Sequence, residues 1–145
     1  MSTKVEAIFT PDITTRQVLP FIEAALVPAG FPSPAGDYEE GELDLNKHLI
    51  KNPAATYCVR VTGDSMNGAG IHSGDILIVD RSKDPQNGNV IIAHVNGELT
   101  VKRLRKDNGK IHLVAENSDY PDREIVEDME FEVWGVVTNV IHSLE

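Results

Sequence analysis

Cysteine is nearly absent from this chain of 145 residues, in which Cys58 is the only one. A single cysteine forms no internal disulfide, which excludes a disulfide-stapled secreted scaffold and fits a reducing cytosol. The sequence also lacks an apolar run near the roughly 18 residues that a membrane-spanning helix needs. Its first residues lack the basic-then-apolar layout of a signal peptide. We therefore expect a cytoplasmic protein that has no membrane partner.

Basic residues are also scarce, with 13 Lys and Arg against 23 Asp and Glu, so that the formal net charge is −10. A surface with this excess of negative charge repels the phosphate backbone, and we expect no direct binding of nucleic acid. The remaining composition, 41% hydrophobic and 25% charged, is that of an ordinary globular protein. The length fits one compact domain with a short appendage.

Residues 1–36 are predicted to form an N-terminal arm, and residues 37–145 the body of the protein. Within the arm, residues 4–9 indicate a short strand, and residues 16–27 carry enough apolar side chains for a helical turn or two, interrupted by Pro20. Residues 27–36 contain three prolines and two glycines, which favour extended, accessible backbone. Such a segment suits a linker, and it also suits the extended conformation in which a protease binds its substrate.

Signals for short β-strands dominate the body. Asp44 is a candidate N-cap for one short helix over residues 45–50. The pairs Asn96-Gly97 and Asn108-Gly109 are strong signals for tight hairpin turns. Apolar or alternating segments predict strands near residues 57–62, 76–79, 90–95, 99–104, 111–115 and 131–141. The predicted fold class is mainly β, with one short helix.

Ser65 is a candidate nucleophile in the glycine-flanked loop Gly63-Asp64-Ser65-Met66-Asn67-Gly68. The commoner role of such a serine is in a turn, and as a nucleophile its hydroxyl needs a base. The histidines show neither the context of a Ser-His-Asp hydrolase nor a paired metal-ligand spacing, so we predict no metal and no cofactor. They are His48, His72, His94, His112 and His142.

Lys102 is the other candidate base, in the segment Thr100-Val101-Lys102-Arg103-Leu104. A lysine that is desolvated in a strand has its pKa lowered, and its neutral amine can accept a serine proton. An edge-strand lysine that prevents aggregation is the alternative interpretation. Neither Ser65 nor Lys102 decides the matter alone.

Together these segments resemble the self-cleaving Ser-Lys peptidases of the LexA/UmuD type. The resemblance rests on Gly63-Asp64-Ser65-Met66, on Gly74-Asp75 before an apolar strand, and on residues 97–104. It implies that Ser65 is the nucleophile and Lys102 the base. The family cleaves an Ala-Gly or Cys-Gly bond in an extended upstream segment, and Ala29-Gly30 occupies that place here.

The repressor members of this family carry a helix-turn-helix domain before the cleaved bond, which takes roughly 60 residues. Only 29 residues precede the bond here, and just two of them, Lys4 and Arg16, are basic. Residues 30–38 and 43–46 are instead similar to the UmuD branch, and the resemblance covers about residues 26–141. It implies a LexA-like C-terminal autoprotease domain preceded by an extended N-terminal arm.

The same resemblance implies an SOS-response mutagenesis protein. Members of the branch are homodimers whose self-cleavage is promoted by RecA filaments on single-stranded DNA. The trimmed dimer then joins a UmuC-type polymerase for error-prone translesion synthesis. The arm is rich in apolar residues, so we expect it to cover part of the body or of a partner subunit near Ser65, and its loss to expose surface for the polymerase. These residues are Ile8, Phe9, Val18, Leu19, Phe21, Ile22, Leu26 and Val27.

Several alternatives stay open. The chain fits a phage- or LexA-type repressor autoprotease without its DNA-binding domain, or a non-catalytic polymerase-binding module in which Ser65 and Lys102 are incidental. Signal peptidases share a Ser-Lys dyad, but they require a membrane anchor. Cys58 is the weakest candidate nucleophile, because it lies in the middle of a predicted strand, where a small buried hydrophobic residue is expected.

Overall fold

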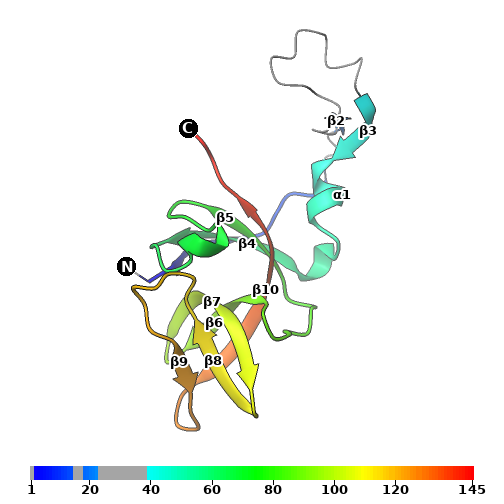
Figure 1. Ribbon diagram of the computed structural model, residues 1–145. Coiled ribbons are helices and arrows are strands. Elements are labelled where there is room, and N and C mark those ends of the chain that lie inside the picture. The colour runs from blue at the N-terminus through cyan, green and yellow to red at the C-terminus, as the bar shows by residue number, and fades with distance from the viewer. Residues whose placement is uncertain (1, 15–17, 23–38) are drawn as a thin grey trace. The chain divides into compact units, whose positions relative to one another are not determined.

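The computed structural model describes residues 2–14, 18–22 and 39–145 (Figure 1). The chain divides into two compact units, of which the larger comprises Met1–Pro11 with Asn52–Glu145 and the smaller comprises Asp12–Lys51. The predicted boundary between residues 36 and 37 lies outside the described residues, as does the proline-rich segment 27–36.

The smaller unit contains a two-stranded antiparallel sheet and one short helix. Strand β2 (Val18–Ile22) pairs with β3 (Glu39–Asp44), and α1 (Leu45–Leu49) follows directly. The Asp44 side chain accepts hydrogen bonds from the first backbone amides of the helix, so the predicted N-cap is confirmed. The helical turns predicted within residues 16–27 are wrong for Val18–Ile22. Pro20 accounts for this difference. A proline disfavours the interior of a helix, whereas both strands of a two-stranded sheet are edge strands, which tolerate a residue without an N–H.

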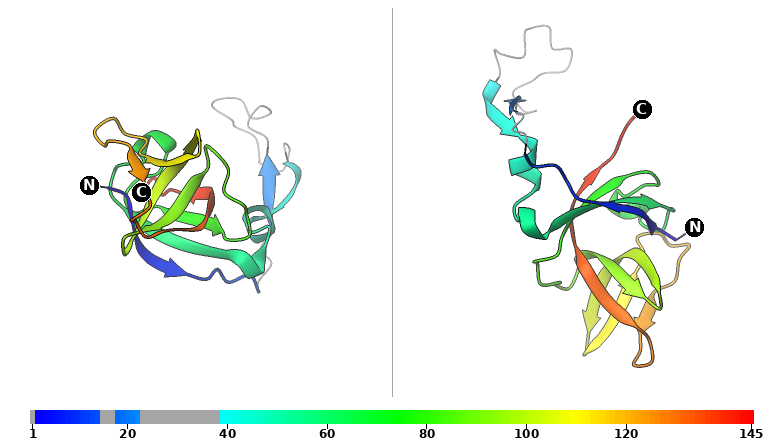
Figure 2. Two further views of the ribbon diagram at one scale, coloured as in Figure 1. Left: turned by 90° about the horizontal axis from the view of Figure 1, so that it is seen from below. Right: turned by 180° about the vertical axis from the view of Figure 1, so that it is seen from behind.

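The larger unit is a single curled sheet of eight antiparallel strands (Figures 1 and 2). Its order is β1-β4-β5-β10-β6-β7-β8-β9, and β1 also pairs with β7 through Lys4 and Thr100, which closes the sheet on itself. The strands are β1 (Lys4–Phe9), β4 (Thr56–Thr62), β5 (Ile76–Asp80), β6 (Val90–Val95), β7 (Glu98–Asp107), β8 (Lys110–Val114), β9 (Arg123–Ile125) and β10 (Phe131–Ile141). The mainly-β fold class is therefore confirmed.

Two tight turns set the pairing of the central hairpins. Asn96 and Gly97 have φ of 47° and 84°, and Asn108 and Gly109 have φ of 49° and 77°. Positive φ at both central residues defines a type I′ turn, whose twist matches that of the strands it joins. The predicted β6–β7 and β7–β8 hairpins are confirmed.

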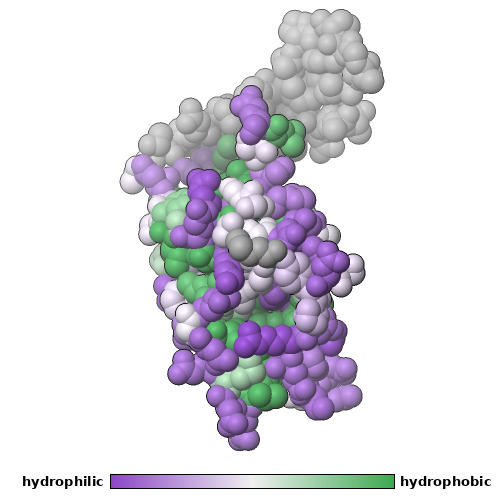
Figure 3. All heavy atoms as spheres, turned by 90° about the vertical axis from the view of Figure 1, so that its left-hand side faces the viewer, coloured by the Kyte–Doolittle hydropathy of each residue, from purple (hydrophilic) through white to green (hydrophobic). Residues whose placement is uncertain are grey.

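The core consists of two clusters on opposite faces of the curled sheet. Side chains alternate between the faces of a strand, so β6 contributes Ile92 to one cluster and Ile91 and Ala93 to the other. In β7, Val101 belongs to the first cluster and Leu104 to the second. Hydrophilic residues predominate on the face shown in Figure 3, with smaller hydrophobic patches between them.

Candidate active site

The loop that follows β4 holds Ser65 in a fixed position. Gly63 directly follows β4 with a φ of 106°, a conformation that glycine adopts without strain. Ser65 and its neighbour Met66 are fully buried, and Met66 belongs to the first core cluster. A short 3₁₀ turn, Asn67–Ala69, follows. The core therefore anchors the loop directly beside the candidate nucleophile.

A second loop, residues 115–122 between β8 and β9, is hydrogen-bonded to the Ser65 loop. The Gly68 N–H donates to the Glu116 carbonyl at 2.8 Å, and a Cβ at Gly68 would lie 2.6 Å from that oxygen. The Tyr120 hydroxyl donates to Asp64 Oδ1 at 2.5 Å. This hydrogen bond raises the pKa of Tyr120 to about 12 and lowers the pKa of Asp64.

Strand β7 brings Lys102 to the same point. Lys102 Nζ lies 2.9 Å from Ser65 Oγ, although the two residues are 37 positions apart in the sequence. The same nitrogen contacts Thr100 Oγ1 and the Val101 carbonyl, both at 3.1 Å. The structure thus brings together the two residues that the sequence motifs single out, and adds Thr100 as a direct partner of the amine.

Burial of the Lys102 side chain disfavours its charged form and lowers its pKa to about 8. The carboxylate of Glu98 opposes this effect, and the ammonium of Lys4 adds to it. An amine with a pKa near 8 is neutral in about one molecule in ten at pH 7, against fewer than one in a thousand for an ordinary lysine. The site therefore supplies a candidate base beside a candidate nucleophile.

The first residues of the chain also reach this site. The apolar residues of the arm led us to expect it near Ser65, but nothing in the sequence singles out Ser2 or Thr3. The Thr3 N–H donates to Ser65 Oγ at 2.8 Å, and Lys102 Nζ donates to the Ser2 hydroxyl at 2.7 Å. Thr3 is fully buried. A cavity of about 280 Å³ opens beside Lys102, and its walls include Ser2, Leu113 and Tyr120.

The other sequence candidates lie elsewhere. Ala29 and Gly30 are outside the described residues. Cys58 is buried in β4, and burial raises the pKa of its thiol, which makes it a poor nucleophile. His142 Nδ1 contacts Asp75 Oδ1 at 2.5 Å, and its ring lies 5.1 Å from that of His72. Within the described residues no group of three or more His, Cys, Asp or Glu side chains is placed to hold a metal ion.

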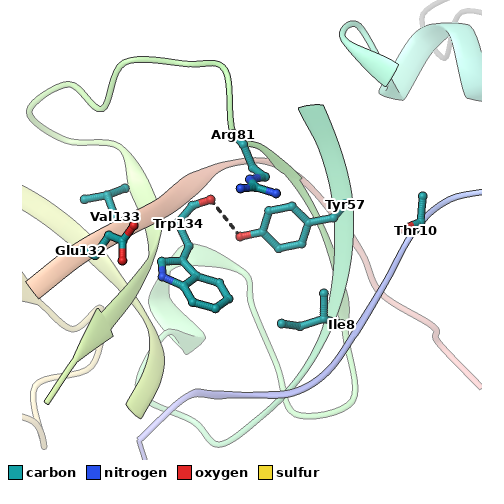
Figure 4. Close-up of a pocket in the computed structure, with 7 residues that line it drawn as sticks. All are labelled: Ile8, Thr10, Tyr57, Arg81, Glu132, Val133 and Trp134. Carbon is teal, nitrogen blue, oxygen red and sulfur yellow. Dashed lines mark hydrogen bonds between the residues drawn. The ribbon is translucent and has the colours of Figure 1, made fainter. Parts of the chain in front are cut away.

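A larger cavity, of about 540 Å³, lies between β1, β4 and β10 (Figure 4). Trp134 and Ile8 line it, and the Tyr57 hydroxyl donates to the Trp134 carbonyl at 3.1 Å. Burial raises the pKa of Tyr57 to about 12, although the nearby Arg81 guanidinium opposes the shift. The described residues that line this cavity include no nucleophile hydrogen-bonded to a base, in contrast to Ser65 and Lys102.

Comparison with known proteins agrees with this geometry. The model of the peptidase S24-like family matches residues 20–138, which include both Ser65 and Lys102. The chain belongs to this family. This match confirms the resemblance to LexA/UmuD-type peptidases, and it shows that the chain belongs to a family of serine-type peptidases.

This S24-like chain has relatives that match over most of its length. It is 50% identical over 116 residues to the protein SamA of Salmonella typhimurium, covering 80% of each chain. It is 49% identical over 115 residues to the protein ImpA of Escherichia coli, covering 79% of this chain and 77% of ImpA. Identity to the protein MucA of Escherichia coli is 45% over 119 residues, 81% of this chain and 79% of MucA. These are UmuD-like proteins, which places the chain in the SOS mutagenesis family.

Among the helices of the described residues, none is long and apolar enough to cross a membrane.

Proposed function

We propose that this S24-like chain is a self-cleaving SOS-response protein, a Ser-Lys peptidase that cuts its own Ala29–Gly30 bond. The observation that carries the proposal is the 2.9 Å contact between Ser65 Oγ and Lys102 Nζ. The lowered pKa of Lys102 supports it, because a base must be neutral to accept a proton. The choice of bond rests on the sequence, in which a pair of small residues lies within a proline-rich segment.

The reaction balances with these two residues and water. The neutral Lys102 amine accepts the Ser65 proton while Oγ bonds to the carbonyl carbon of Ala29. The tetrahedral intermediate then collapses, the bond to the Gly30 nitrogen breaks, and the Lys102 ammonium gives that nitrogen its proton. A water molecule next attacks the ester, with Lys102 again as base. The ester breaks to release the Ala29 carboxyl group, and Ser65 regains its proton.

The proposal also covers the location of the protein in the cell and its partners. As a UmuD-like protein it is expected to form a homodimer in the cytoplasm, to cleave faster with RecA filaments on single-stranded DNA, and to join a UmuC-type polymerase after trimming. The support is its relationship to SamA, ImpA and MucA. The net charge of −10 fits a protein that reaches DNA through partners and does not bind it alone.

The test follows the purified chain over time at pH 7 to 10, with and without RecA filaments, by gel and N-terminal sequencing. We expect a product that begins at Gly30, and no product from Ser65→Ala, Lys102→Ala or Ala29→Asp. Lys110→Ala, at an exposed lysine, is the matched control and should cleave normally. If the unaltered chain stays intact under all conditions but binds the polymerase, it is the non-catalytic binding module instead.

A mixing experiment separates cleavage within one chain from cleavage between chains. A Ser65→Ala chain keeps its cleavable bond but lacks the nucleophile, whereas an Ala29→Asp chain keeps the nucleophile but lacks the bond. Product from the mixture, with none from either chain alone, means that one subunit cuts its partner. No product from the mixture means that each chain cuts itself.

A further inference from the structure

The N-terminal segment Ser2–Lys4 fills the Ser65–Lys102 site. Besides the contacts of Ser2 and Thr3 with the two site residues, the Thr3 carbonyl accepts hydrogen bonds from the Thr100 hydroxyl at 2.9 Å and from the Val101 N–H at 3.1 Å. The next residue, Lys4, pairs with Thr100 in the sheet. The segment thus lies along β7 as an added strand, which is how extended peptides bind to sheet edges.

This arrangement is incompatible with attack by Ser65. A backbone N–H can only donate, so the hydrogen bond from Thr3 engages one of the two lone pairs of Ser65 Oγ. The Thr3 nitrogen also stands 2.8 Å from Oγ, closer than the roughly 3–3.5 Å at which a reacting carbonyl carbon must be placed. A peptide bond to be cleaved cannot share this space with Thr3.

We propose that Ser2–Lys4 is an internal competitor of the cleavage segment, which keeps self-cleavage slow until the segment leaves the site. The inference rests on the proposed function, because it takes Ser65 as the nucleophile of the cleavage reaction. The competitor also uses the Thr100 hydroxyl and the Val101 N–H, two donors that an incoming strand along β7 would need.

The segment is held in a way that permits release. Thr3 Oγ1 is buried without a hydrogen-bond partner among the described residues, and such a group opposes burial. The ion pair of Lys4 with Glu98, at 3.3 Å, is solvent-exposed and therefore weak. β1 pairs with β7 only at Lys4, whereas it pairs with β4 at four further positions between Val5 and Phe9. Ser2–Lys4 can therefore leave the site while the rest of β1 stays on β4.

The test measures access to Ser65 separately from self-cleavage. The full chain is treated with a fluorophosphonate, which modifies activated serines, and Ser65 labelling is followed by mass spectrometry. Deletion of residues 2–4 should raise both the labelling rate and the self-cleavage rate by about tenfold, because the competent fraction increases. Ser2→Ala, which removes the contact with Lys102 Nζ, should raise both rates by a smaller factor.

Thr3→Val tests the opposite direction. It keeps the shape and the backbone contacts of Thr3 but removes the unpartnered hydroxyl, so it should hold the segment more firmly and slow both rates severalfold. Glu6→Gln, at an exposed position of β1, is the matched control and should change neither rate. If the deletion disturbs folding, as circular dichroism would reveal, Ser2→Ala and Thr3→Val decide the outcome.

Equal labelling of Ser65 in the unaltered chain, Ser2→Ala and Thr3→Val overturns the inference, even if all three cleave. Labelling that follows the expected order, in chains that never cleave under any condition, supports occupancy of the site but refutes the proposed function. The two failures are therefore distinguishable.

Discussion

The pH dependence of self-cleavage is the sharpest consequence of the partly buried Lys102 amine. With a pKa of about 8, the neutral fraction is about 0.1 at pH 7, 0.5 at pH 8 and 0.9 at pH 9. If the neutral amine is the base, the rate without RecA should rise about tenfold from pH 7 to pH 9 and level off above it. An ordinary lysine would instead give a rise of several hundredfold between pH 7 and pH 10, without a plateau.

The perturbation that tests the cause is Glu98→Gln. The Glu98 carboxylate raises the pKa of Lys102 against the effect of burial, so its removal should move the midpoint of the rate profile to lower pH. Lys102→Arg should be inactive across the range, because a guanidinium stays protonated. The midpoint is the readout, because it follows the pKa of Lys102, whereas the height of the profile also changes when the Lys4–Glu98 ion pair is lost.

The assay takes samples over time from buffers of constant ionic strength between pH 6.5 and 10, with circular dichroism at each pH to confirm that the fold is intact. A rate that is flat over this range would remove Lys102 from the mechanism. A rate that still climbs steeply at pH 10 would mean that the amine is not desolvated, and a midpoint that Glu98→Gln moves upward would refute the electrostatic argument.

Three further predictions concern the structure around the site. Tyr120→Phe removes the hydrogen bond to Asp64 beside Ser65, so self-cleavage should slow severalfold while its pH midpoint, set by Lys102, stays the same; a shifted midpoint would contradict a purely positioning role. Lys102→Met should raise the free energy of unfolding at pH 7 by about 1–2 kcal/mol in urea titrations, because it removes a partly desolvated ammonium. The folded pKa lies below the unfolded value of 10.5, so this gain should shrink as the pH rises from 8 toward 10, and a gain that is constant with pH would refute it. Gly135→Ala should cost about 1–3 kcal/mol, because its Cβ would lie 2.5 Å from Val79 Cγ1; the same change should cost less in a Val79→Ala background, and equal costs would exclude the clash.

Local chemistry accounts for the parts of the fold that the sequence predicts. The Asn-Gly pairs at 96–97 and 108–109 specify their turns because few other residues accept positive φ at both positions. Asp44 caps α1 because its short carboxylate reaches the free amides of the first turn. Strand β10 matches its predicted limits, Phe131–Ile141. Each of these depends on neighbours within a few positions, which the sequence displays directly.

Long-range pairing accounts for what local patterns miss. Val18–Ile22 resembles a helical segment until its pairing with β3 makes it a strand. The three-residue strand β9 is too short to show a period, and it exists only because β8 supplies its partner. Nothing in the neighbouring sequence predicts that position 135 requires a glycine, because the side chain that a Cβ there would meet belongs to Val79 of β5.

The candidate site shows the same division. From the sequence alone, Ser65 and Lys102 were identified as candidate catalytic residues by the resemblance of their motifs, because a serine in a loop or a lysine in a strand has no local feature that indicates catalysis. The 2.9 Å contact, and the burial that lowers the pKa of Lys102 to about 8, came only with the tertiary structure, since desolvation depends on what the folded sheet places around the amine. The position of Thr3 beside Ser65 depends wholly on the tertiary structure, because β1 closes the sheet and brings the first residues of the chain to a serine 62 positions away.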